Sequence, residues 1–328
     1  MKAIVVTRYG SPDVLQLQEV AKPTPKDHEV LIKIRASSVS SGDSRIRRAD
    51  PFLVRFFYGF SRPKASILGN EFAGVIEAVG QGVTRFRPGD EVFGAAGFNL
   101  GTNAEYITLP EDGPIAHKPA NITFEGAAVI PFGATAALHF LRDKANIQPG
   151  QKILINGASG SLGTAAIQLA KHFGAEVTAI NSGANAELVR SLGADKMIDY
   201  TREDFTQSGE TYDLIFDSIG KLSFAQSKGS LKEDGLFLAA SAGLTEFFQA
   251  MWTSIIGGKK VVAGVVEEDQ SALLFLKDLI ETGKLRAVID RTYTLEETAE
   301  AHRYVDKGHK KGNVVIRIPQ VEEQEIRA

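Results

Sequence analysis

The sequence predicts a two-domain α/β protein that combines a small β-barrel with a parallel sheet covered by helices. The chain has 328 residues, and a single core seldom extends beyond roughly 250–300 residues. Residues 1–115 read as short strands separated by turns that contain glycine or proline. From Gln151 onward, short apolar segments alternate with helical ones, which is typical of a parallel sheet.

Strand signals define the first part of the chain. Val30, Ile32 and Ile34 recur at every second position, as they do on the buried face of a strand. The sequence RPGD at 87–90 is a turn signal between two further strands. We expect strands over residues 2–7, 29–36, 71–80, 90–94 and 104–109.

Continuous apolar triplets mark the second part. The triplets at 153–155 and 214–216 show no polar alternation, as expected for strands buried on both faces. Residues 121–140 are rich in alanine, but Pro131 and Gly133 interrupt any helix there. The last segment, 322–328, is polar and expected to fray. We expect strands over 152–156, 176–180, 196–198, 212–217, 236–240, 259–266, 286–289 and 314–318, and helices over 162–173, 184–192, 272–281 and 295–306.

Composition excludes several classes of function. There are 37 basic and 40 acidic residues, a net charge of −3, so no basic excess exists for binding nucleic acid. The chain has no cysteine, which excludes disulfides, thiolate nucleophiles and iron–sulfur clusters. The N-terminus lacks a signal-peptide core and no apolar window is long enough to span a membrane. We expect a soluble, cytoplasmic protein.

A glycine-rich segment follows the expected strand at 152–156 and opens the expected helix. Gly157 permits a tight turn, Gly160 lets the backbone approach a pyrophosphate, and Gly163 lets the helix pack against the strand. N–H groups at the start of the helix would bind phosphate oxygens. The segment predicts a dinucleotide-binding loop, with a purely structural turn as the alternative. Its cofactor-binding candidates are Ser159, Gly160, Ser161, Leu162 and Gly163.

The residues after the next strand favour NADP(H) over NAD(H). An NAD site usually places Asp or Glu there, whereas this sequence has Asn181, Ser182 and Gly183. Ser182 could bind the 2′-phosphate, and Tyr200, after the third strand, could close over it. No Lys or Arg lies within a few residues of Ser182. The alternative is that Ser182 and Tyr200 merely end their strands.

Several further motifs recur in a fixed order along the chain. They are MKAI at 1–4, GNEFAG at 69–74, RPGDEV at 87–92, AEY at 104–106, the glycine loop, LGAD at 192–195, IDY at 198–200 and KGNVV at 311–315. In order and spacing they resemble the medium-chain dehydrogenase/reductase superfamily, in its zinc-independent NADPH:quinone oxidoreductase-like branch. The resemblance covers nearly all of residues 1–318.

The resemblance implies the domain organisation. It implies a GroES-like β-barrel catalytic domain and a Rossmann domain with a doubly wound parallel sheet, and an active site in the cleft between them. The implied ranges are 1–120 for the first part of the catalytic domain, 121–266 for the NADP-binding domain and 267–328 for the segment that returns to the catalytic domain.

Departures from the zinc-containing relatives imply chemistry without a metal. Those enzymes bind zinc through cysteines and the His of a Gly-His-Glu segment, where this chain has Asn70 and no cysteine. The six histidines show no tight ligand spacing. Quinones and α,β-unsaturated carbonyls accept a hydride without a Lewis acid, because their charge spreads onto oxygen. We therefore expect a conjugated acceptor and no metal site.

The resemblance also assigns individual contacts. Asp43, a catalytic candidate, matches an Asp in a cleft-lining Asn-x-x-Asp segment whose Asn is Ser40 here; helix capping is the alternative. Thr135, Ser241 and Asn313 fall where relatives contact the cofactor, with helix packing or turn formation as the alternative.

Tyr58 is the second catalytic candidate, because its phenol could protonate an enolate. It lies in the aromatic-rich segment 51–60, for which a hydrophobic lid is the alternative. Four phenylalanines of this segment would suit a flat apolar substrate, although they could equally pack together. They are Phe52, Phe56, Phe57 and Phe60.

The predicted function is that of an NAD(P)H-dependent oxidoreductase that transfers a hydride to a quinone or an α,β-unsaturated carbonyl. The alternatives are a non-catalytic NADPH-binding or interaction protein and an alcohol dehydrogenase-type enzyme. The strand expected at 259–266 could form an open sheet edge, which predicts a homodimer. We expect no nucleic-acid or membrane partner.

Overall fold

The computed structural model describes residues 1–264, 266 and 269–319, and these divide into two compact units. Among the described residues, the barrel unit contains 1–132 and 269–319, and the sheet unit contains 133–264 and 266. Residues 121–132 thus belong by their contacts to the barrel unit. The domain boundaries expected at 120/121 and 266/267 stay predictions.

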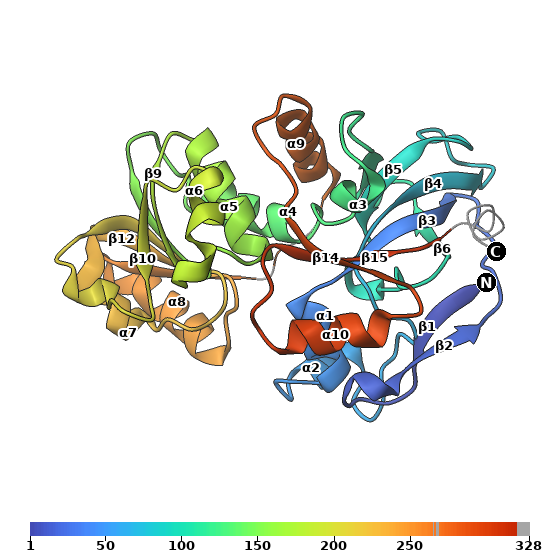
Figure 1. Ribbon diagram of the computed structural model, residues 1–328, viewed down its shortest axis with the longest axis horizontal. Coiled ribbons are helices and arrows are strands. Elements are labelled where there is room, and N and C mark those ends of the chain that lie inside the picture. Colours follow the sequence, from blue (N-terminus) through green and yellow to red (C-terminus); the bar gives the residue numbers. More distant parts are fainter. Residues whose placement is uncertain (265, 267–268, 320–328) are drawn as a thin grey trace. The chain divides into compact units, whose positions relative to one another are not determined.

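Strand β3 (Glu29–Val39) organises the barrel unit. It pairs antiparallel with β4 (Glu71–Val79), β6 (Tyr106–Pro110) and β15 (Asn313–Arg317). Strands that are far apart in the sequence, β3 and β15, therefore lie side by side (Figure 1). The main sheet has the order β14-β15-β3-β4-β5-β7. The remaining elements of this unit are β1 (Lys2–Val6), η1 (Pro12–Val14), β2 (Leu15–Glu19), α1 (Ser41–Arg48), α2 (Val54–Tyr58), β5 (Glu91–Ala95), η2 (Gly97–Asn99), β7 (Ile115–His117), α3 (Phe124–Ala127), α9 (Gln270–Glu281), β14 (Ile289–Thr294) and α10 (Thr298–Asp306).

Alternation in β3 places its apolar side chains in the barrel core. Val30, Ile32 and Ile34 have no exposed surface, which confirms the period-2 pattern. These side chains are buried beside strands that come from both the early and the late part of the sequence.

The sheet unit contains one six-stranded sheet. Its strand order is β10-β9-β8-β11-β12-β13, and every neighbouring pair is parallel. The order reverses between β8 and β11, as in a doubly wound dinucleotide-binding fold. The elements of this unit are α4 (Gly133–Leu138), the π-helix η3 (His139–Lys144), β8 (Lys152–Asn156), α5 (Ser161–His172), β9 (Glu176–Asn181), η4 (Gly183–Asn185), α6 (Ala186–Ser191), β10 (Lys196–Asp199), η5 (Phe205–Gln207), β11 (Tyr212–Asp217), α7 (Phe224–Ser227), η6 (Lys228–Ser230), β12 (Leu231–Ala239), α8 (Leu244–Ile256) and β13 (Lys260–Ala263).

Several expected boundaries need correction. The strand expected over 286–289 lies later in the sequence, as β14 (Ile289–Thr294), which pairs with β15. Val288 precedes the strand, and its carbonyl accepts a hydrogen bond from the Asn313 N–H. The helix expected from residue 295 begins at Thr298. The strand expected over 259–266 is ordered as β13 from Lys260 to Ala263, and part of that range lies outside the described residues, as does the segment 322–328. Helix α8 was not expected at all.

Candidate active site

The junction between β8 and α5 needs glycine at two of its three positions. Gly157 has a φ of +72°, and a Cβ there would lie 2.6 Å from the side chains of Ser218 and Ile219. A Cβ on Gly163 would lie 2.3 Å from the carbonyl oxygen of Gly157. The strand, turn and helix therefore pack only with glycine at these two positions.

Gly160 differs, because the protein's own packing does not require glycine there. A Cβ at this position would meet only the Gly157 carbonyl oxygen, at 3.4 Å, among the described residues. Its φ of −80° suits any residue. The absence of a side chain here leaves the backbone open to a closely approaching ligand, as the sequence predicts.

The start of α5 presents helix N–H groups at the same turn. Gly160 is the N-cap and carries no capping side chain, and the first helical bond runs from the Thr164 N–H to the Gly160 carbonyl at 2.9 Å. The N–H groups of Leu162 and Gly163 have no acceptor within the helix. This turn follows β8, where the strand order reverses, and it suits an anionic group.

Asn185 joins the glycine loop to the end of β9. Its amide nitrogen donates to the Ser159 hydroxyl at 3.0 Å and to the Ser182 hydroxyl at 3.3 Å. Two sequence-predicted site residues are thereby brought together by a residue that the sequence did not indicate. Tyr200, by contrast, is 59% exposed, and its role over a 2′-phosphate stays a prediction.

A carboxylate lies beside this region on the neighbouring strand. Asp199 ends β10 and pairs with Asn181 of β9, and it accepts hydrogen bonds from the hydroxyl and N–H of Thr201 at 2.7 and 3.0 Å. These hydrogen bonds lower the pKa of Asp199. Its Oδ2 lies 2.6 Å from the position of a Cβ on Gly183. β10 therefore places a carboxylate beside the end of β9, and this carboxylate accepts hydrogen bonds from Thr201 and Gly183.

Thr135 lies close to the start of α5. A Cβ on Gly133, the first residue of α4, would lie 2.5 Å from the Ser161 hydroxyl, so the two helices meet at their first turns. Thr135 is buried, and its hydroxyl has no hydrogen-bond partner among the described residues. A buried unpartnered hydroxyl beside a dinucleotide turn fits a polar ligand.

Ser241 follows β12 at the same edge of the sheet. Its hydroxyl donates to the Ser218 carbonyl, just beyond β11, at 3.3 Å. At this edge, Asn156 of β8 donates to Asp217 of β11 at 2.9 Å, which joins the two strands between which the order reverses. With the open turn at Gly160 and the unpartnered Thr135 hydroxyl, the residues at this edge fit a ligand that carries a diphosphate.

In the barrel unit, Asp43 takes part in a buried capping box at the start of α1. The N–H and hydroxyl of Ser40 donate to the Asp43 carboxylate at 2.7 and 2.6 Å, and the Asp43 N–H donates back to Ser40 at 3.1 Å. Burial raises the pKa of Asp43. The capping alternative is thus present in the structure, with Ser40 as N-cap and Asp43 three residues on, and a catalytic role for Asp43 stays a prediction.

The segment around α2 presents aromatic rings on the surface of the barrel unit. Phe52, Phe56 and Phe60 contact one another edge to face, with ring centroids 5.8–6.1 Å apart, and Phe57 is 70% exposed. Tyr58 is only partly exposed, and the centroid of its ring lies 6.2 Å from that of the Phe98 ring. Its catalytic role stays a prediction.

Asn313 is buried where β15 begins. Its side-chain amide donates to the Val288 carbonyl at 3.1 Å, which ties β15 to the residue before β14. The bond is of the structural kind that sequence reasoning kept as the alternative. Cofactor contact by Asn313 stays a prediction.

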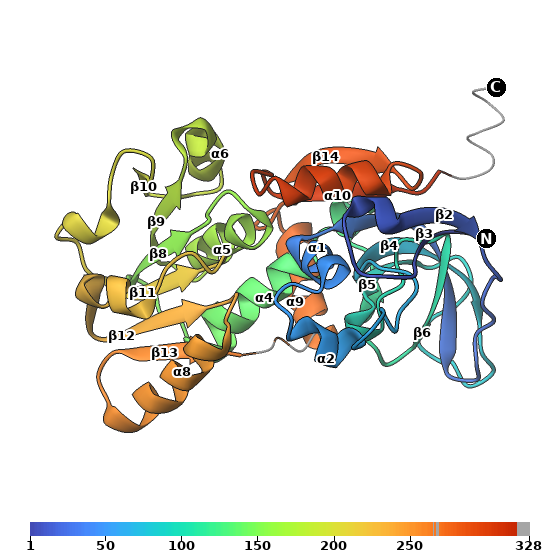
Figure 2. The ribbon, with the colours of Figure 1, turned by 90° about the horizontal axis from the view of Figure 1, so that it is seen from below.

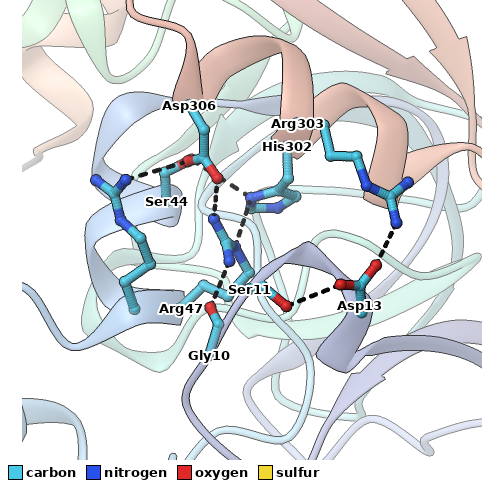
Figure 3. Close-up of polar contacts among 9 residues, drawn as sticks. Gly10, Ser11, Asp13, Ser44, Arg47, His302, Arg303 and Asp306 are labelled. Carbon is cyan, nitrogen blue, oxygen red and sulfur yellow. Dashed lines mark hydrogen bonds and ion pairs between the residues drawn. The ribbon is translucent and has the colours of Figure 1, made fainter.

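A buried arginine fastens α1 to α10 (Figure 3). Arg47 has no exposed surface; it donates to the His302 Nδ1 at 3.3 Å and pairs with Asp306 and the Gly10 carbonyl. Burial, with the Arg47 charge, lowers the pKa of His302 to about 3. The imidazole is therefore neutral, and this network holds the helix that carries Asp43.

The described residues contain no group of three or more His, Asp or Glu side chains that could hold a metal ion. At the position where zinc-containing relatives have the ligand His, this chain has Asn70. The residues present do not fit a catalytic zinc site, and independence from zinc stays a prediction.

Two family models match the chain. One described as "Alcohol dehydrogenase GroES-like domain" matches residues 26–120, and one described as "Zinc-binding dehydrogenase" matches residues 192–316. Residues 121–191, which contain the glycine turn, lie outside both matched ranges.

Three similar proteins span nearly the whole chain. The 2-methylene-furan-3-one reductase of Solanum lycopersicum is 34% identical, over 96% of this chain and 79% of its own length. The chloroplastic NADPH-dependent alkenal/one oxidoreductase of Arabidopsis thaliana is 33% identical over the same shares. The quinone oxidoreductase structure from Coxiella burnetii has a TM-score of 0.89 and 29% identity, covering 97% of this chain and 99% of its own.

The chain therefore belongs to the medium-chain dehydrogenase/reductase superfamily, in its quinone oxidoreductase-like branch. This confirms the resemblance and the expected combination of a GroES-like and a parallel-sheet dinucleotide-binding fold. In the described part of the chain, every helix is too short or too polar to cross a membrane.

Proposed function

We propose that the protein is an NADPH-dependent oxidoreductase that transfers a hydride to quinones or α,β-unsaturated carbonyl compounds. The observation that carries this proposal is the β8–α5 turn, where packing requires two glycines and leaves a third open to a ligand. The names of the three relatives support the acceptor class.

The residues of the sheet unit would bind and orient the coenzyme. The N–H groups of Leu162 and Gly163 would hold its diphosphate, and the unpartnered Thr135 hydroxyl is a further donor. When bound, the reduced nicotinamide would supply the hydride. Asp43 and Tyr58 are the proposed catalytic residues of the barrel unit, with Asp43 shaping the acceptor site and Tyr58 offering a phenol proton.

The preference for NADPH rests on the end of β9. Ser182 offers a hydroxyl to a 2′-phosphate, Tyr200 offers an exposed ring, and the Asp199 carboxylate is occupied by Thr201 and Gly183. The NADPH dependence named for the Arabidopsis relative supports this choice.

The test is NADPH oxidation by the purified protein with a panel of quinones and 2-alkenals, with NADH and simple ketones as comparisons. Turnover with conjugated acceptors and not with simple ketones is the expected result. Tight NADPH binding without turnover of any acceptor would instead favour a non-catalytic binding protein. Activity with alcohols that a chelator abolishes would favour an alcohol dehydrogenase-type enzyme.

A homodimer through the open edge of the sheet is part of the proposal. β13 is the last strand of the sheet and pairs with β12, and α8 lies beside it (Figure 2). Several large apolar side chains of α8 are exposed, and such a patch is typical of a protein–protein interface. They are Leu244, Phe247, Phe248, Met251, Trp252, Ile255 and Ile256.

Sedimentation at micromolar concentration tests the dimer. Trp252→Lys should yield a monomer, whereas the matched change Leu274→Lys, at an exposed position of α9, should leave the mass unchanged. A wild-type monomer would remove the dimer from the proposal. A cytoplasmic location is likewise proposed, and cell fractionation tests it.

A further inference from the structure

A patch of exposed hydrocarbon lies on the barrel unit around α2, a helix that contacts α1 (Figure 1). All five of its side chains are exposed, and none of them carries a polar atom. Exposed apolar surface that is gathered in one place is typical of an interaction site. The members of this apolar patch are Phe52, Leu53, Phe56, Phe57 and Phe60.

The base of the apolar patch is fixed to the barrel unit. The guanidinium of Arg55 lies over the ring of Tyr9, 4.7 Å from its centroid, and donates to the Phe60 carbonyl at 2.9 Å. The Tyr9 hydroxyl donates to the Gly59 carbonyl at 2.5 Å. The phenyl rings therefore project from a segment that is anchored on both sides of Tyr58.

Much of the backbone of the patch makes its own hydrogen bonds. The N–H groups of Val54, Arg55 and Phe56 each donate to the carbonyl three residues earlier, at 2.9–3.1 Å, and the Gly59 N–H donates to the Arg55 carbonyl at 2.9 Å. Pro51 has no N–H to satisfy. Backbone groups that are already paired can enter an apolar medium at little cost, because unpaired ones are expensive there.

Positive charge flanks the apolar patch. Residues 51–70 contain three basic side chains and no acidic one. Two of these side chains, Arg62 and Lys64, are exposed. The Lys64 N–H donates to the Tyr58 carbonyl at 2.7 Å, so the backbone that carries them returns to the end of α2. The net charge of −3 for the whole chain hides this local excess.

We propose that the apolar patch and its basic flank dock the protein onto an anionic lipid surface. The apolar side chains enter the boundary between headgroups and acyl chains, while Arg62 and Lys64 bind lipid phosphates. Because α2 has only five residues, the contact is peripheral. This binding replaces the expectation of no membrane partner, which rested on the composition of the whole chain, and it is independent of the proposed hydride transfer.

The chemistry of the patch favours lipid over the other occupants. A protein interface carries about one hydrogen bond per 100–200 Å², whereas the side chains of the apolar patch offer neither a donor nor an acceptor. A second copy of the chain fits this face poorly, because the basic flanks of the two copies would repel each other. An anionic lipid surface meets both the hydrocarbon and the positive charge.

Co-sedimentation of the purified protein with vesicles tests this docking. Vesicles of phosphatidylcholine and phosphatidylglycerol should bind the wild type about tenfold or more tightly than vesicles of phosphatidylcholine alone, and added salt should weaken that binding. The double change Phe56→Ser/Phe57→Ser should lower vesicle binding by about tenfold or more, because it removes hydrocarbon that enters the bilayer. The double change Arg62→Gln/Lys64→Gln should remove most of the preference for anionic vesicles.

Matched controls alter exposed positions elsewhere on the barrel unit. Leu274→Ser on α9 and Lys307→Gln/Lys311→Gln between α10 and β15 should bind vesicles as the wild type does. A wild type that binds no anionic vesicle, or that binds both kinds of vesicle equally, would overturn the inference. So would unchanged binding by Phe56→Ser/Phe57→Ser. If that variant instead lost turnover of a water-soluble acceptor and kept its vesicle binding, the patch would belong to the acceptor and not to a lipid surface.

Discussion

The Nε of Arg47 lies 3.3 Å from the Nδ1 of His302, in a contact that joins α1 to α10 inside the barrel unit. Because a guanidinium only donates, the imidazole must accept at Nδ1 and stay neutral. Arg47 also forms an ion pair with Asp306 of the same helix, α10. The contacts that hold α1, the helix that carries Asp43, thus include a pH-sensitive group, the imidazole of His302 (Figure 3).

Acid should destabilise the protein through His302. Its pKa is about 3 in the folded state and about 6.5 when unfolded, so only the unfolded chain takes up a proton between these values. The free energy of unfolding should therefore fall as pH drops below about 6.5, by at most about 1.4 kcal/mol per pH unit. Urea titrations between about pH 7.5 and 5 measure the slope. His302→Gln should flatten it, and His309→Gln, at an exposed position, should not.

Removal of Arg47 should be far more damaging than removal of its neighbour. Arg47→Met leaves Asp306 and His302 without their buried partner, which should cost about 3–5 kcal/mol. Arg48 contacts the same Asp306 at 3.6 Å but is 40% exposed, so Arg48→Met should cost less than about 1 kcal/mol. Chemical denaturation of both variants checks the contrast. Equal losses would show that the charge on Asp306, and not the buried network, is what matters.

The glycines of the loop should separate folding from coenzyme binding. Gly163→Ala places a Cβ against the Gly157 carbonyl and should cost about 1–3 kcal/mol of stability. Gly160→Ala meets no such contact; it should leave stability within about 1 kcal/mol while weakening NADPH binding by about tenfold or more. Calorimetric titration with NADPH, beside thermal melts, measures both. Undiminished binding by Gly160→Ala would place the diphosphate elsewhere.

Asn185 should discriminate between the two coenzymes. Asn185→Asp introduces a negative charge between Ser159 and Ser182, which should raise the Kd of NADPH by about tenfold and that of NADH by less than about twofold. The neutral change Asn185→Ala should affect both coenzymes alike, because it only loosens the loop. If Asn185→Asp weakens neither, the 2′-phosphate does not lie beside β9.

Local patterns predicted much of this architecture. Strand β8 and the start of α5 were predicted to within one residue, because apolar runs and glycine spacing act within a few positions of the sequence. Asp199 was missed as a neighbour of Asn181, since that relationship arises from the pairing of two strands. The signal that could have revealed it is the rule that parallel strands end at one edge of a sheet.

Other features leave little trace in the sequence. Helix α8 was missed because its apolar residues face outward and do not mark a buried stripe. The capping box of Ser40 and Asp43 was recognisable only as an alternative, because capping and catalysis favour the same residue types.

The pairing of β3 with β15 has a consequence for synthesis on the ribosome. The central strand of the barrel lacks one of its partners until Arg317 has left the exit tunnel, whereas the strands of the sheet unit are contiguous and complete at Ala263. The nascent sheet unit can therefore form first, and the barrel closes only after β15 has been synthesised. In a nascent chain truncated just before β14, the sheet unit should accordingly resist protease, whereas the barrel unit should be digested.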